Sequence, residues 1–78
     1  MDEQQAIETV ENHIEEAKKQ AERGPTDTLF KYHRDWAFRI CRGMQALADS
    51  TGNAEAFDEW KQRLLRVLDL DRLAAEHR

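Results

Sequence analysis

The sequence has 78 residues, of which 36% are charged and 40% hydrophobic, and its net charge is −4. This length allows one domain, and a single cysteine, Cys41, excludes an intramolecular disulfide. No run approaches the roughly 18 consecutive apolar residues of a transmembrane helix. We therefore expect a soluble protein of the cytoplasm, a reducing compartment that suits one unpaired thiol.

Two groups of helix-breaking residues, RGPTD at 23–27 and DSTGN at 49–53, divide the chain into three helical stretches. The first helix is expected over about residues 3–22, with Asp2 as its N-cap and Gln5 completing a capping box. Its apolar residues follow a spacing of three and four that forms a narrow seam: Ile7, Val10, Ile14, Ala17 and Ala21. A seam this slight suits close packing on the second helix or contact with another copy of the chain.

The second helix is expected over about residues 28–48, capped by Asp27 or Thr26. Its apolar residues cover a wide face, which is typical of a core helix that meets several neighbours. That face holds Leu29, Tyr32, His33, Trp36, Ala37, Ile40, Cys41, Met44, Leu47 and Ala48. On this assignment Trp36 lies in the core and Cys41 is a buried structural thiol.

The third stretch begins after Asn53, which is a suitable N-cap. One helix face holds Phe57, Trp60, Leu64, Val67 and Leu68, and a second group does not fit it: Leu65, Leu70 and Leu73. A break near Asp69 resolves most of this mismatch, so we expect helices over about 54–68 and 70–77. The predicted fold class is all-α, a compact three-helix bundle with a possible short fourth C-terminal helix, the alternative being an unbroken third helix. It forms a single helical domain over residues 1–78.

Groups that could support catalysis are scarce. His33 lies two helical turns before Cys41, too far for the two side chains to meet on one helix. His13 and Glu16 are three residues apart, which is a weak metal-binding signal. The three glycines lie far apart and form no phosphate-binding pattern. We therefore expect no enzymatic activity, no catalytic residues, no cofactor and no metal site.

The segment KYHRDWAFRICRG, residues 31–43, carries the most distinctive surface pattern. On a helical wheel its basic residues share the face opposite the predicted core, with Phe38 at the centre of that face. An aromatic anchor ringed by arginines is typical of a protein-binding hot spot. The predicted partner-binding residues are Lys31, Arg34, Phe38, Arg39 and Arg42. Two alternatives remain open, namely that Phe38 is a lone exposed ring or that the C-terminal segment covers it.

These observations predict a small non-enzymatic protein–protein interaction module. It would act as an inhibitor, an adaptor or an assembly subunit by occupying a surface of a larger protein partner. The small core also favours a homodimer, and no membrane partner is expected. The alternative is a nucleic-acid-associated regulator that uses the basic and aromatic face of the second helix. The net charge of −4 disfavours it, because long-range attraction to a polyanion would be weak.

Overall fold

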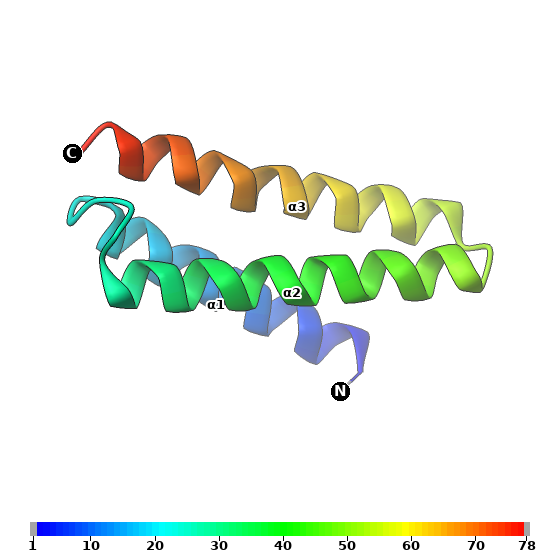
Figure 1. Ribbon diagram of the computed structural model, residues 1–78. Helices are drawn as coiled ribbons and strands as arrows, with labels where there is room; N and C mark the ends of the chain where they lie inside the picture. Colours follow the sequence, from blue (N-terminus) through cyan, green and yellow to red (C-terminus); the bar gives the residue numbers. More distant parts are fainter. Residues whose placement is uncertain (1, 78) are drawn as a thin grey trace.

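Three helices make up the protein in the computed structural model, which describes residues 2–77. α1 spans Glu3–Ala21, α2 spans Thr28–Ser50 and α3 spans Ala54–Ala75. α2 and α3 lie side by side, and α1 crosses α2 at an angle (Figure 1). The molecule measures 41 × 20 × 13 Å, so the bundle is a flat and elongated layer. The predicted all-α class is confirmed.

The first turns of α1 and α2 are held by the side chains that the sequence suggested. Asp2 accepts a hydrogen bond from the Gln5 backbone N–H at 2.8 Å, and the Asp2 N–H donates to Gln5 Oε1 at 3.2 Å. This reciprocal pair is the predicted capping box. Asp27 caps α2 by accepting from the Phe30 N–H at 3.0 Å. α2 then continues to Ser50, slightly past the expected end at about residue 48.

A tight turn joins α2 to α3. Gly52 adopts a φ of +69°, in the left-handed region that favours glycine after a helix C-cap. Its N–H donates to Asp49 O at 3.1 Å, and the Asn53 N–H donates to Ala48 O at 2.9 Å. The Asn53 side chain accepts from the Ala56 N–H at 3.0 Å. Asn53 therefore completes the end of α2 and caps the start of α3, which makes the two helices antiparallel neighbours.

Small side chains line the buried faces of α1 and α2, and large ones complete the core. The buried apolar residues are Ala6, Val10, Ile14, Ala17 and Ala21 of α1, Phe30, Ala37, Cys41 and Ala48 of α2, and Trp60, Val67, Leu70 and Ala74 of α3. The predicted seam of α1 is confirmed at four of its five positions, and Ile7 is partly buried beside it. Trp60 is 1% exposed, as the sequence predicted.

The predicted break near Asp69 is wrong, because α3 runs without interruption from Ala54 to Ala75. The structure shows no fourth helix among residues 2–77. The physical reason is that α3 packs against two helices and so buries more than one stripe. Arg66 pairs with Glu11 of α1, while Asp71 pairs with Arg34 of α2. Leu70, which does not fit the face of Trp60 on a wheel, is only 2% exposed.

α2 is rotated about its axis relative to the prediction. Its buried residues Phe30, Ala37 and Cys41 centre about 70° away from the middle of the predicted apolar face. Trp36, predicted to lie in the core, is 42% exposed, and this prediction is wrong. Compact side chains such as Ala37 and Cys41 face the neighbouring helices, where they allow close approach, and bulky side chains occupy the outer face. None of the three helices is long and apolar enough to cross a membrane.

Candidate protein-docking surface

The outer face of α2 carries a continuous row of large apolar side chains. Leu29, Tyr32, Trp36 and Leu47 are exposed by 50%, 52%, 42% and 55%. At 100° per residue they fall, with Gly43 and the partly buried Ile40, within an arc of about 80°. We call these six residues the α2 stripe: Leu29, Tyr32, Trp36, Ile40, Gly43 and Leu47. The stripe extends over about 27 Å of helix, since each residue adds about 1.5 Å.

Charged residues border the stripe on the flank that faces away from α1. The guanidinium of Arg39 lies 5.6 Å from the centre of the Trp36 ring, which is within the range of a cation–π contact. Asp35 is exposed on the same flank. A row of aromatic and aliphatic side chains with a charged border is the composition of a protein-binding surface, in which an apolar centre is surrounded by a polar rim.

A cluster of rings lies where the stripe meets α1. His13 of α1 and His33 of α2 place their Nδ1 atoms 2.9 Å apart, which is a hydrogen-bond distance. One of the two nitrogens must carry the shared proton and the other must accept it. The Tyr32 ring packs edge-on against both imidazoles, with centroid separations of 6.0 Å to His13 and 5.0 Å to His33. The cluster therefore holds the Tyr32 ring against His13 of α1.

The pKa of His13 is lowered from its usual value, first by burial and then by the nearby His33. At neutral pH the His13 ring is therefore uncharged. Protonation of both rings would place two positive charges side by side and leave neither Nδ1 atom able to accept. This pair was not predicted from the sequence, because 20 residues separate its members.

The structure does not gather the five residues of the predicted partner-binding surface on one exposed face. Phe38 is partly buried and packs against the core, while Lys31, Arg39 and Arg42 are exposed. Arg34 reaches across to α3 and forms two hydrogen bonds with Asp71, at 3.0 and 2.8 Å. Phe38 is therefore not a lone exposed ring, because it packs against the core of its own chain.

Arg34 belongs to the contact between α2 and α3. Its guanidinium lies 4.9 Å from the centre of the Phe38 ring, and its pKa is raised chiefly by the hydrogen bonds to Asp71. The charge of Arg34 is therefore matched within the chain. A partner-binding role for Lys31, Arg34, Phe38, Arg39 and Arg42 stays a prediction. Within the chain, Arg34 pairs with Asp71 of α3 and Phe38 packs against the core.

Cys41 is fully buried, as predicted. Burial raises the pKa of its thiol to about 11, although Arg63 and Arg66 lie close enough to oppose this shift. The thiolate, which is the nucleophilic form, is therefore a minor species at neutral pH. Within residues 2–77, no group of three or more His, Cys, Asp or Glu side chains could hold a metal ion.

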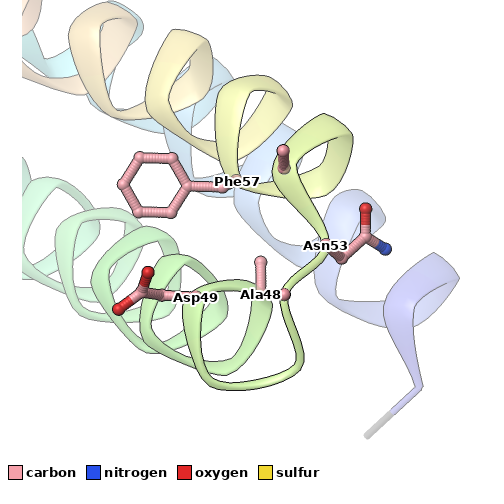
Figure 2. A pocket seen from close by; sticks show the side chains of 6 residues that line it. Ala48, Asp49, Asn53 and Phe57 are labelled. Atoms are coloured by element: carbon pink, nitrogen blue, oxygen red, sulfur yellow. The ribbon is translucent and has the colours of Figure 1, made fainter.

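A second, shorter group of exposed apolar residues lies on α3. Phe57, Leu65 and Leu68 are 37%, 49% and 42% exposed. Figure 2 shows the hollow beside Phe57 at the turn between α2 and α3, with Asp49 and Asn53 at its edge. Its volume of about 220 Å³ is below the roughly 300–1,000 Å³ of typical small-molecule pockets. This hollow is therefore too small to serve as an ordinary ligand pocket.

Comparisons with protein-family models, with curated proteins and with solved structures find no match to this chain.

Proposed function

We propose that the protein is a small non-enzymatic protein–protein interaction module and that its docking surface is the α2 stripe. It acts as an inhibitor, an adaptor or an assembly subunit by covering a surface of a protein partner. The observation that carries the proposal is the exposure of Leu29, Tyr32, Trp36 and Leu47 on one face of one helix. Tyrosine and tryptophan are the residues that most often dominate binding energy at interfaces.

Apart from Ile40, which packs against the core, the stripe is not needed to complete the core of the chain. Trp60, Phe30 and Leu70 already fill the interior, with exposed fractions of 1%, 2% and 2%. Covering an exposed large apolar side chain is worth about 1.5–3 kcal/mol at full burial. The stripe leaves that free energy unused within the chain, and a partner that buries the stripe gains it.

Other classes of function have less support. The thiol of Cys41, the strongest potential nucleophile, is buried and has a raised pKa, which favours a structural role. A nucleic-acid partner would need the basic residues of α2, and Arg34 is already paired with Asp71. We place the protein in the cytoplasm, where a single thiol without a disulfide partner stays reduced.

The experiment is site-specific photo-crosslinking in cells that express the chain natively. A photoreactive amino acid replaces Leu47 of the stripe, or in the matched control Leu65 of α3, which is similarly exposed at 49% against 55%. We expect a defined protein adduct from position 47 and none of comparable yield from position 65. Adding Trp36→Ala should abolish the adduct at position 47.

Both labelled chains should retain the circular dichroism spectrum and melting temperature of the parent, because both positions are on the surface. Equal adducts from positions 47 and 65, or an adduct at 47 that persists after Trp36→Ala, would show that the stripe is not the docking surface.

A further inference from the structure

We infer that the α2 stripe binds a second copy of this chain, with the two α2 helices antiparallel about a twofold axis at the level of residue 38. This inference rests on the proposed function and names its partner. The order of residues along the stripe supports this inference. In an isologous contact, residue i of one copy meets residue j of the other, and j meets i. A single helix face can form such a contact when its residues, read in one direction, fit against the same residues read in the opposite direction.

The stripe has this property. Reversal about residue 38 sets Leu29 against Leu47 at each end and Trp36 against Ile40 near the axis. Leu29 and Leu47 are 50% and 55% exposed, so the two ends of the contact offer matched surfaces. Both pairs are centred on residue 38, so a single twofold axis can form both of them.

In the same arrangement Tyr32 is level with Met44 of the other copy and lies one residue from Gly43. An added Cβ at Gly43 would touch nothing within 4 Å, so α2 has open space above this glycine. Tyr32 is 52% exposed and its ring is held by His13 and His33. Antiparallel pairing places the Tyr32 ring of one copy near the Gly43 backbone of the other, twice. Parallel pairing would instead set Trp36 against Trp36 and Gly43 against Gly43, which packs unevenly because large faces large and small faces small.

The charges on the border of the stripe are complementary in the same register. Antiparallel helices place the same flank of both copies together, and Asp35 and Arg39 are both exposed on the flank away from α1. Arg39 of one copy then lies about half a helical turn from Asp35 of the other and equally far from its Arg39, so two attractive contacts oppose one repulsive contact. The twofold axis produces this ion pair twice, at the rim of the contact.

The available area sets the strength of the dimer. A tyrosine or tryptophan side chain buries about 150–250 Å² when fully covered, so Tyr32 and Trp36 together leave roughly 200 Å² open on each copy. The half-exposed leucines at the two ends add to this apolar centre. A standard interface buries about 800 Å² per partner, and the rim formed by Asp35, Arg39 and the facing side of α1 must supply the rest. We therefore expect dissociation in the micromolar range.

A charge-exchange experiment on the full chain tests the arrangement. Sedimentation equilibrium from 1 to 500 µM should show a monomer–dimer equilibrium for the parent. Asp35→Arg and Arg39→Asp should each shift dissociation to at least tenfold higher concentration, since each sets like charges together. An equimolar mixture of the two variants should regain dimers, because every cross-pair is then opposite in charge. Both substitutions in one chain should also restore the dimer.

The direction of pairing has its own readout. Spin labels at Ala46, which is exposed beside the stripe, should lie on the order of 25 Å apart in an antiparallel dimer and about 10–15 Å apart in a parallel one. Since the substituted positions are on the surface, circular dichroism should show parent-like helix content in every variant.

A parent chain that stays monomeric at 500 µM would overturn the inference. If Leu47 nevertheless crosslinks to a different protein in cells, the proposed function stands without it. A dimer that ignores both charge substitutions, or that shows the short spin-label distance, would also overturn the antiparallel arrangement.

Discussion

The two tryptophans of the chain occupy opposite environments although both lie on helices. Trp60 is 1% exposed, and the guanidinium of Arg63 lies 4.7 Å from the centre of its ring. Trp36 is 42% exposed and has Arg39 beside it on the surface. The same residue type therefore reports on the core at one position and on the docking surface at the other.

Replacing each tryptophan with alanine should separate these roles. We expect Trp60→Ala to lower the free energy of unfolding by about 3–5 kcal/mol, as for other large-to-small changes in a core. Trp36→Ala should lower it by about 1 kcal/mol or less, since much of this ring is already in water. Urea titration at 1 µM, below the expected dimer range, provides both values. Equal losses would place Trp36 in the core and contradict the orientation of α2.

The His13–His33 pair makes stability depend on pH. The pKa of His13 is lower in the folded protein than in the unfolded chain, where it is about 6.5. The unfolded chain therefore binds more protons between these two pKa values, and the free energy of unfolding falls as the pH drops below about 6.5. The free energy of unfolding stops falling once the pH is below the pKa of His13 in the folded protein.

We expect the melting temperature at 1 µM to fall between pH 7.5 and pH 5.5, and His13→Asn to remove most of this dependence. His77→Asn is the matched control, because His77 is exposed near the C-terminus and should leave the dependence intact. The carboxylate of Glu11, whose pKa is lowered by its hydrogen bonds to Arg66, titrates at more acidic pH and does not interfere. An unchanged pH dependence in His13→Asn would refute the assignment to this pair.

Helix ends were predictable from the sequence, whereas the orientation of the helices was not. Asp2, Asp27 and Asn53 act on backbone groups within three residues, so local sequence determines them. The buried face of α2 depends on where α1 and α3 lie. Its apolar residues span roughly half of the helix circumference, and hydrophobicity alone cannot select among them. The continuity of α3 escaped prediction for the same reason, because two neighbouring helices share its apolar residues.

Two glycines in similar exposed settings should respond oppositely to alanine. Gly52 has a φ of +69°, a conformation that costs a residue with a Cβ about 1–2 kcal/mol, so Gly52→Ala should destabilise the protein by that amount. Gly43 lies inside α2 with open space around it, so Gly43→Ala should stabilise the monomer by up to about 1 kcal/mol. Urea unfolding at 1 µM measures both. A destabilised Gly43→Ala variant would show that a Cβ atom at position 43 clashes with a neighbouring group.

At the scale of the whole molecule, the bundle is only 13 Å thick along its shortest principal axis. One shared layer of side chains serves all three helices, and Cys41 lies within it. The exposed fraction of this residue is 0%, and burial raises the pKa of the thiol to about 11. Access of a reagent to Cys41 therefore requires the helices to separate, so the thiol reports on opening of the bundle as a unit.

Modification of Cys41 by a thiol reagent at pH 7 should be slower in the native protein than in the urea-unfolded chain. For a domain with a stability of about 3–5 kcal/mol, opening limits the rate by roughly 10²–10⁴-fold. Trp60→Ala should accelerate the reaction by the same factor as it raises the equilibrium constant of unfolding, and Leu65→Ala should not. Rapid reaction of the native parent would show that Cys41 is accessible and would reopen the question of a reactive thiol.

The double role of Asn53 also bears on how the chain folds. Because one residue ends α2 and starts α3, these two helices meet through contacts that are close in sequence, and closing such a short loop costs little entropy. We expect the α2–α3 hairpin to form first and to serve as the folding nucleus, onto which α1 then docks. Topologies dominated by local contacts of this kind fold in microseconds to milliseconds. A newly made chain would thus spend little time with its core aromatic residues, Phe30 and Trp60, exposed to water.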